Sequence, residues 1–224
     1  MTYDYGNWLL VIVISTIFLL FLFDAFKPKT GTDWHTYGSF AAFIVALFAE
    51  MYGFPLTIYL LTAWFGTKLP QLNTSHNSGH LWETLLGNTG NPHISMLHII
   101  SNVSLVGGVL LIGAAWNILY AAAKNRTLAT TGPYQYIRHP QYTGFILKII
   151  GFLHQWPTIP TLLMAPFLIW RYVKLAHGEE HRVSSIYPLY TAYRLKTPAW
   201  IPSFYTLWQL IMHTRKGGDQ HGKK

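Results

Sequence analysis

The sequence predicts an all-α, polytopic membrane protein, and three observations support this fold class. Of the 224 residues, 51% are hydrophobic and only 11% are charged, a composition that is too apolar for a soluble globular domain. Several apolar stretches approach the length of about 20 residues that a helix needs to cross a bilayer. Lysine and arginine gather in the polar breaks between those stretches, as they do in the loops of membrane proteins.

Charge and cysteine usage exclude several function classes. The net charge of +8 would suggest a nucleic-acid partner in a soluble protein. In a lipid-embedded chain the same charge indicates orientation and contact with anionic headgroups, so we expect the bilayer and no nucleic acid as a partner. The absence of cysteine excludes disulfide frameworks, thiolate metal sites and cysteine nucleophiles.

Four apolar regions predict about five membrane helices, because the fourth region is long enough for a helical hairpin. A proline inside the second region, Pro55, predicts a kink there. Between the two arms of the hairpin lies HQWPTIP, whose Trp156 we expect near an interface of the membrane. The regions are Trp8 to about Phe23, about Tyr37 to Phe65, about Met96 to Ala123, and the hairpin arms Gln141 to Leu153 and Thr161 to about Leu175.

The distribution of basic residues predicts the orientation. With the N-terminus outside and the C-terminus in the cytoplasm, Lys68 is the only lysine or arginine in an outer loop, as the positive-inside rule requires. The cytoplasmic side then receives Lys27, Lys29, Lys124, Arg126, Arg138 and nearly all of the C-terminal basic residues.

The stretch TGPYQYIRHPQYTG, residues 131–144, is the first candidate site. Pro140 suits the first position of a helix, because its φ angle is fixed and the N–H it lacks would have no helical partner there. The free N–H groups of that helix end favour an anion, and Arg138 adds a full positive charge beside it. The alternative is that Arg138 contacts lipid phosphate and that the tyrosines form an interfacial belt.

Two acidic residues, Glu179 and Glu180, form the core of the second candidate segment. They follow a membrane helix where the positive-inside pattern would place bases. Glu179 could form a helical i to i+3 pair with Arg182. The two carboxylates could instead bind hydroxyl, sulfonium or amine groups of a ligand, or act as a general base.

Taken together, the two segments resemble a known enzyme family. The string GPYQYIRHPQYTG resembles the GPYxxxRHPxYxG signature of the isoprenylcysteine carboxyl methyltransferase and phospholipid methyltransferase group. The string EEHRVSSIYPLYTAYRLKTPAWIP resembles the block that follows the signature in that group, with a helical hairpin between them. The resemblance covers about Thr131 to Pro202, and it departs from the group's usual Phe-Gly at Ile186, Tyr187 and Pro188.

The resemblance implies a membrane-embedded methyltransferase that uses S-adenosylmethionine and methylates a lipophilic or lipidated acceptor. It implies a catalytic region over residues 131–204, preceded by a helical region over 1–130 and followed by a basic tail over 205–224. The active site would face the cytoplasm. The residues it implies are Arg138 and Glu180 for catalysis and Tyr134, His139, Pro140, Tyr142, Glu179, Tyr190 and Tyr193 for binding the cofactor.

The nature of the acceptor decides what chemistry these residues must perform. Methyl transfer is an in-line displacement, so catalysis rests on positioning and electrostatics. If the acceptor is a carboxylate, Arg138 could hold it or hold the carboxylate of the cofactor. If the acceptor is an amine, a base is needed, and Glu180 is the better-placed candidate.

Two other functions remain open from the sequence. The tail IYPLYTAYRLKTPAWIPSF is similar to the C-terminal pattern of membrane steroid and sterol reductases, which use NADPH. A non-enzymatic scaffold or metal-handling protein would act through the outer loop, but we predict no metal site there. The side chains that raise these questions are Glu50 and Lys148 within the membrane and His76, His80, His93 and His98 of the outer loop.

Overall fold

The computed structural model describes residues 5–26, 31–69, 74, 76–87 and 91–203, and this part of the chain is helical without a strand. It confirms the all-α fold class. The described helices that are long and apolar enough to cross a membrane are Trp34–Gly53, Met96–Lys124 and Ile159–Ile186. Shorter apolar helices cover Trp8–Asp24 and Leu56–Phe65. The count of five spans and the orientation stay predictions, and the basic tail over 205–224 lies outside the described residues.

The chain divides into two compact units. The first contains Met1–Val109 and Phe145–Leu175, and the second contains Leu110–Gly144 and Ala176–Lys224. The divisions fall inside three helices, α5 (Met96–Lys124), α6 (Pro140–Gln155) and α7 (Ile159–Ile186), so each of these contributes residues to both units.

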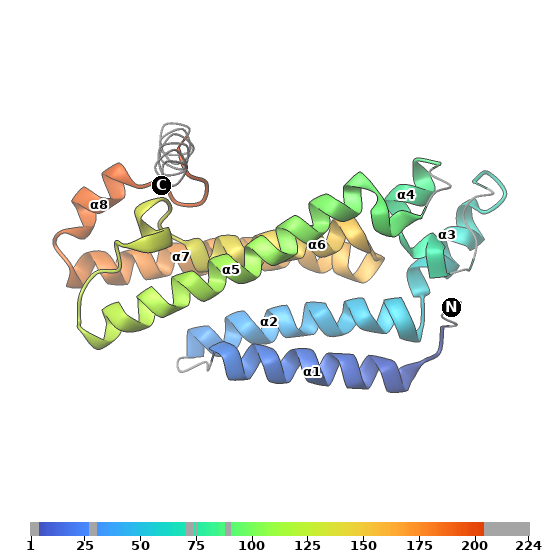
Figure 1. The fold of residues 1–224 in the computed structure, drawn as a ribbon, viewed down its shortest axis with the longest axis horizontal. Helices are drawn as coiled ribbons and strands as arrows, with labels where there is room; N and C mark the ends of the chain where they lie inside the picture. The colour runs from blue at the N-terminus through green and yellow to red at the C-terminus, as the bar shows by residue number, and fades with distance from the viewer. Residues whose placement is uncertain (1–4, 27–30, 70–73, 75, 88–90, 204–224) are drawn as a thin grey trace, which may run out of the picture. The chain divides into compact units, whose positions relative to one another are not determined.

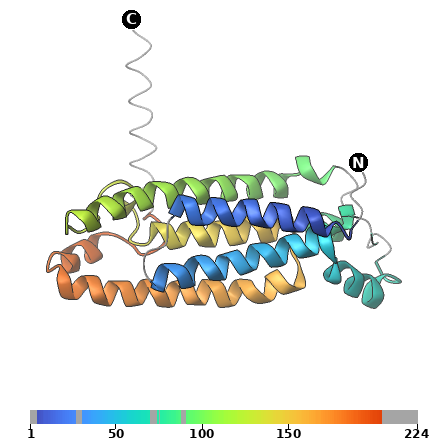
Figure 2. The same ribbon diagram turned by 90° about the horizontal axis from the view of Figure 1, so that it is seen from below.

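Aromatic side chains form much of the core of the first unit. Helices α1 (Trp8–Phe26) and α2 (Gly31–Phe48) lie side by side (Figures 1 and 2). The ring of Phe40 is fully buried and lies 6.1 Å from Phe18 and 5.2 Å from Phe145, between ring centroids. The ammonium of Lys148, only 3% exposed, lies 4.7 Å from the Phe40 centroid and 5.5 Å from that of Phe18. These cation–π contacts place Lys148 in the aromatic core of this unit.

The second apolar region is two helices, so the prediction of one kinked helix from Tyr37 to Phe65 is wrong. Helix α2 ends at Phe48 and a π-helical turn, Ala49–Gly53, follows it. Helix α3 (Leu56–Phe65) begins after Pro55. Phe54 is extended, with φ −111° and ψ 108°, because a residue before proline is sterically disfavoured in the helical region. The proline therefore separates two helices.

Glu50 connects this break to the start of α7. Its buried carboxylate accepts hydrogen bonds from the Thr57 N–H at 3.0 Å and from the Thr57 hydroxyl at 3.1 Å. The Thr57 hydroxyl oxygen in turn accepts the N–H of Ile159 at 2.8 Å. N–H groups at helix starts have no partner within the helix, so these bonds satisfy the starts of α3 and α7. These hydrogen bonds indicate that Glu50 has a structural role, in joining the start of α3 to the start of α7.

Replacing Thr57 with valine is expected to lower the free energy of unfolding by about 1–3 kcal/mol, because it leaves Oε1 of Glu50 and the N–H of Ile159 without their partner, while Oε2 of Glu50 keeps the backbone N–H of residue 57. Thr57 is only 2% exposed, so water cannot replace the hydroxyl. Denaturant unfolding in detergent measures the change. Thr57→Ser is the control, because it keeps the hydroxyl; equal stability of the valine and serine variants would contradict this account.

The turn between α6 and α7 is fixed by side-chain hydrogen bonds. The Thr161 N–H bonds to the Thr158 hydroxyl at 3.2 Å, and the Thr158 N–H bonds to the Thr161 hydroxyl at 3.1 Å, a reciprocal cap of the α7 N-terminus. Trp156 is only 3% exposed and packs on the ring of His80, 4.7 Å between centroids, and its position near a membrane interface stays a prediction. A side chain at Gly79 would clash with it, because an added Cβ would lie 1.9 Å from the indole.

Helix α7 continues well beyond the predicted end near Leu175. It runs for 28 residues to Ile186, with Pro166 inside it, so Glu179 and Glu180 lie on its last turns. The predicted end lies where hydropathy falls, but hydropathy indicates which solvent surrounds a helix and not where the helix ends. The helix stops just before Tyr187-Pro188, where proline disfavours further helix.

Three histidines of the segment that was predicted to form the outer loop pack on one another. The ring centroids of His80, His93 and His98 lie 4.9 to 5.8 Å apart. His80 Nδ1 bonds to the carbonyl oxygen of Gln155 at 3.0 Å. Within the described part of the chain, no group of three histidine or acidic side chains is arranged to hold a metal ion. The side chain of His76 lies outside the described residues.

Candidate functional site

Backbone hydrogen bonds within the second unit join the two candidate segments. This unit contains the end of α5, the 3-10 helix η4 (Gly132–Gln135), the start of α6, the end of α7 and helix α8 (Tyr190–Lys196), which folds back from α7 (Figure 1). Helix α6 begins at Pro140, as the sequence predicts. The N–H of Arg138 donates to Pro198 O at 2.9 Å, and the N–H of His139 donates to Ala199 O at 3.1 Å. These bonds attach the segment after α8 to the Arg-His-Pro triplet.

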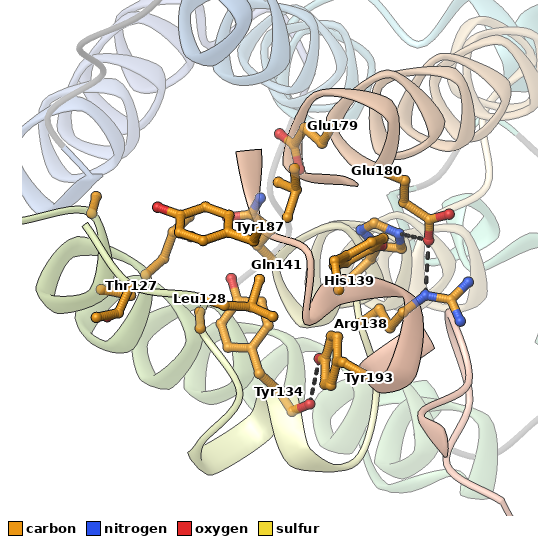
Figure 3. Close-up of a pocket in the computed structure, with 16 residues that line it drawn as sticks. Thr127, Leu128, Tyr134, Arg138, His139, Gln141, Glu179, Glu180, Tyr187 and Tyr193 are labelled. Atoms are coloured by element: carbon orange, nitrogen blue, oxygen red, sulfur yellow. Dashed lines mark hydrogen bonds and ion pairs between the residues drawn. The ribbon is translucent and has the colours of Figure 1, made fainter. Parts of the chain in front are cut away.

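A buried cluster of charged side chains lies at this junction (Figure 3). One carboxylate oxygen of Glu180, Oε1, accepts hydrogen bonds from Arg138 Nε and from His139 Nε2, each at 2.8 Å. Its second oxygen, Oε2, lies 3.8 Å from Arg194 Nε. The side chains of Arg138 and Glu180 are only 13% and 7% exposed, so little solvent screens this pair. Glu180 is therefore the common hydrogen-bond acceptor of Arg138 and His139, with the exposed Arg194 side chain nearby.

The guanidinium of Arg138 also binds the segment at the end of α8. Its Nη1 donates to the carbonyl oxygens of Arg194 at 3.0 Å and Thr197 at 2.7 Å. The planar fork of arginine allows one side chain to join a carboxylate on α7 to two carbonyls of the following segment. No hydrogen bond from Nη2 is found among the described residues, so this nitrogen can still donate to a ligand.

His139 is the neutral member of the cluster. Burial lowers the pKa of its imidazole below the usual value of 6.5, while the hydrogen bond to Glu180 partly opposes that shift. Because a carboxylate only accepts hydrogen bonds, Nε2 carries the proton in this arrangement. The ring also packs on Trp200, with centroids 5.2 Å apart. His139 thus links α7 to the segment after α8 without adding a charge.

Acidification is expected to destabilise this cluster. Between the lowered folded pKa and the unfolded value of 6.5, the unfolded chain binds a proton at His139 that the folded chain does not. The stability that His139 contributes is therefore present above pH 6.5 and is lost as the pH falls to the folded pKa. Unfolding temperatures measured from pH 8 to about 5 test this. The drop should be smaller in His139→Gln, which has no titrating ring; identical pH profiles would contradict the assignment.

The tyrosines of both segments surround the same space. The Tyr142 hydroxyl donates to Glu179 Oε1 at 2.6 Å, and the Tyr193 hydroxyl donates to the carbonyl oxygen of Tyr134 at 2.6 Å. Burial raises the pKa of Tyr190 to about 12, with a further contribution from the charge of Glu180, so this phenol stays protonated. The ring of Tyr134 points into the pocket, and its buried hydroxyl has no hydrogen-bond partner among the described residues. A buried polar group without a partner indicates a place for a ligand or water.

A pocket of about 180 Å³ lies against these side chains (Figure 3). One side of it is polar and aromatic, and the other is an apolar wall from the end of α5 and the loop after it. The lining residues are Leu119, Ala122, Ala123, Thr127, Leu128, Ala129, Tyr134, Arg138, His139, Gln141, Glu179, Glu180, Val183, Tyr187, Tyr190 and Tyr193.

Most of the residues predicted from sequence line this pocket, but two do not. Pro140 is the first residue of α6, and Tyr142 donates a hydrogen bond to the lining residue Glu179. Lys148 is not among the lining residues either. The apolar wall was not predicted, because small apolar residues at the end of a membrane helix are typical of ordinary helix packing. Their position directly before the TGPYQY segment was the signal that could have included them.

Comparison with known proteins agrees with the resemblance of the motifs. Residues 94–185 match the isoprenylcysteine carboxyl methyltransferase (ICMT) family. The chain is 29% identical over 94 residues, 40% of its length, to the protein-S-isoprenylcysteine O-methyltransferase of Schizosaccharomyces pombe. No solved structure matches the chain.

Two further relatives carry names from metal resistance. The chain is 32% identical over 93 residues to the cobalt-zinc-cadmium resistance protein CzcN of Cupriavidus metallidurans, and 32% identical over 94 residues to the nickel-cobalt-cadmium resistance protein NccN of Alcaligenes xylosoxydans xylosoxydans. Each match covers 41% of this chain. The matches span only 43%, 44% and 40% of the lengths of CzcN, NccN and the S. pombe protein.

Proposed function

We propose that this chain is an S-adenosylmethionine-dependent methyltransferase that methylates a carboxylate on a lipophilic acceptor. The observation that carries the proposal is the cluster of Arg138, His139 and Glu180. It joins the two motif segments beside a pocket, and its three residues lie within the stretch that matches the methyltransferase family.

The groups in the pocket fit S-adenosylmethionine. The cofactor has an apolar-faced purine, hydroxyls, an amine, a carboxylate and a sulfonium. The pocket offers the apolar side chains at the end of α5, the unpartnered hydroxyl of Tyr134, the acidic side chain of Glu179 and the remaining donor of Arg138. We assign binding of the cofactor to these groups. When bound, the cofactor supplies an electrophilic methyl group whose sulfonium loses its charge on transfer.

The hydrogen bonds of Glu180 favour a carboxylate as the acceptor. A general base must have a lone pair directed at the proton it removes. Oε1 of Glu180 already accepts from both Arg138 and His139, and Oε2 faces Arg194. An amine acceptor would need this base, whereas a carboxylate attacks without losing a proton. Arg138 and Glu180 then act by holding the pocket in shape and by orienting the reactants.

The proposal also includes the position of the pocket relative to the membrane. Apolar helices place the chain in a bilayer, and we propose that the pocket faces the cytoplasm, where the soluble cofactor is available. The catalytic region, predicted as residues 131–204, is extended to begin near Leu119, because the end of α5 supplies the apolar wall. A lipophilic acceptor would reach the pocket from the lipid phase.

Thermal unfolding of the purified protein in detergent tests the cofactor. S-adenosylmethionine and its demethylated product should each raise the unfolding temperature in a saturable way, because a ligand that binds the folded state stabilises it. NADPH should not. Stabilisation by NADPH alone would replace this proposal with the reductase alternative. Tyr134→Phe, which removes only the unpartnered hydroxyl, should weaken the stabilisation, and Tyr136→Phe, outside the lining of the pocket, should not.

Metal handling is the second candidate function, and only the names of CzcN and NccN favour it. Replacing His80 and His93 with alanine should reduce metal tolerance of the producing cells if this function holds. The methyltransferase proposal instead expects tolerance to be unchanged and methyl transfer to be retained in these variants, because neither side chain lines the pocket.

A further inference from the structure

Tyr187 lines the pocket at the turn between the end of α7 and the start of α8. It follows the last residue of α7, Ile186, and its backbone is held on both sides. Its N–H donates to Val183 O at 2.9 Å, and its carbonyl oxygen accepts the N–H of Tyr190 at 2.9 Å. Pro188 further restricts its backbone. The Cα of Tyr187 is therefore fixed, and only its side chain can change position.

The ring of Tyr187 extends across the pocket from the end of α7 toward Thr127 and Leu128 (Figure 3). It is half-buried, and its hydroxyl has no hydrogen bond among the described residues. Arg138 and Glu180 are bonded to each other, and Tyr193 is bonded to the carbonyl oxygen of Tyr134. The hydroxyl of Tyr134 has no partner among the described residues either, but its ring is only 6% exposed and is held by packing. Tyr187 is thus the half-buried aromatic side chain of the lining that can rotate without breaking a hydrogen bond found among the described residues.

The volume of the pocket makes the position of this ring important. At about 180 Å³ the pocket is smaller than the roughly 300–1,000 Å³ of pockets that bury drug-sized ligands. The apolar wall belongs to a helix end, and the opposite wall is held by the charged cluster. The space beside Thr127 and Leu128 can therefore grow most easily by removal or rotation of the Tyr187 ring.

We propose that Tyr187 is a specificity-determining residue that limits the bulk of the acceptor beside its carboxylate. This inference rests on the proposed function, since it assigns the space beside Thr127 and Leu128 to the acceptor. Acceptors with a small group next to the carboxylate fit under the ring, and those with a bulky group collide with it. The aromatic ring sets the limit by its size, and the hydroxyl makes no contribution.

The inference is tested with two carboxylate acceptors, N-acetyl-S-farnesylcysteine and N-benzoyl-S-farnesylcysteine. They differ only in the size of the acyl group beside the carboxylate. Binding of each is measured from its stabilisation of the full chain, and methyl transfer from S-adenosylmethionine is measured separately. Wild type should prefer the acetyl compound. Tyr187→Ala should shift the ratio of affinities toward the benzoyl compound by about tenfold or more, the range in which pocket shape discriminates small apolar groups. Tyr187→Phe should keep the wild-type ratio.

The control is Ile186→Ala, which changes the neighbouring side chain, 59% exposed and absent from the lining of the pocket. Tyr187→Leu replaces the alanine variant if that one does not fold. An unchanged ratio in the variant without the ring, a changed ratio in Tyr187→Phe, or a wild type that binds neither compound would each overturn the inference. Binding with the expected ratios but without methyl transfer would instead overturn the proposed function and leave the role of Tyr187 supported.

Discussion

Replacing Glu180 with alanine is expected to abolish ligand binding in the pocket and to lower the free energy of unfolding by about 3–5 kcal/mol, the usual effect of removing one partner of a buried ion pair. The carboxylate is the common acceptor for Arg138 and His139, and both would lose it inside a site with little solvent. The segment that Arg138 holds would then lose its anchor on α7. Denaturant unfolding and stabilisation by S-adenosylmethionine measure the two effects.

Two variants of the same helix separate this effect from general damage to α7. Ser184→Ala lies one turn beyond Glu180, is exposed and loses only a bond to the carbonyl of its own helix, so it should behave as wild type. Glu180→Gln keeps the shape and one acceptor for His139 but not the charge, and should be intermediate. If Glu180→Ala binds S-adenosylmethionine with wild-type affinity and stability, the cluster does not organise the pocket.

Replacing Arg138 with lysine is expected to be almost as harmful as replacing it with alanine, with loss of methyl transfer by about 100-fold or more. Lysine keeps the charge but cannot reproduce three directed bonds to the Glu180 carboxylate and to the carbonyls of Arg194 and Thr197. The segment that closes one side of the pocket would then be released. If only the positive charge of Arg138 mattered, Arg138→Lys would instead keep most of the activity.

Limited proteolysis gives a readout of this release that does not depend on activity. Arg194 and Lys196 are exposed trypsin sites within the segment that Arg138 holds. Cleavage at these two sites should be faster in Arg138→Lys than in wild type, whereas cleavage after Lys174, on the body of α7, should not change. Equal cleavage rates at Arg194 in all variants would show that Arg138 does not anchor the segment.

The local features of the candidate site could be predicted because they depend on neighbouring residues. Pro140 starts a helix through its fixed φ angle, whatever surrounds it. The Arg-His-Pro triplet and the paired glutamates were recognisable as motifs, and most of their polar residues do line one pocket. Their roles in binding and catalysis stay predictions until the variants above are measured.

The errors in the prediction have a common cause, because each concerns what a residue contacts. The last helical arm was expected to end where hydropathy falls, but α7 continues to Ile186 and brings Glu180 to Arg138. The second apolar region was expected to form one helix, and the hydrogen bonds between Glu50 and Thr57 stabilise two. These partners are 7 to 42 positions apart, and no local pattern specifies them.

The sequence by itself determined the all-helical membrane class, the start of α6 and the two segments that carry polar chemistry, since composition, periodicity and proline act locally. The tertiary structure decided how those segments are used. It carried α7 on to Ile186, so that Glu180 meets Arg138 and His139 from 41 or 42 positions away. It supplied the apolar wall from α5 and directed the ring of Tyr187 across the pocket. Hydrogen bonds and packing between distant segments set these features, and those depend on the folded chain.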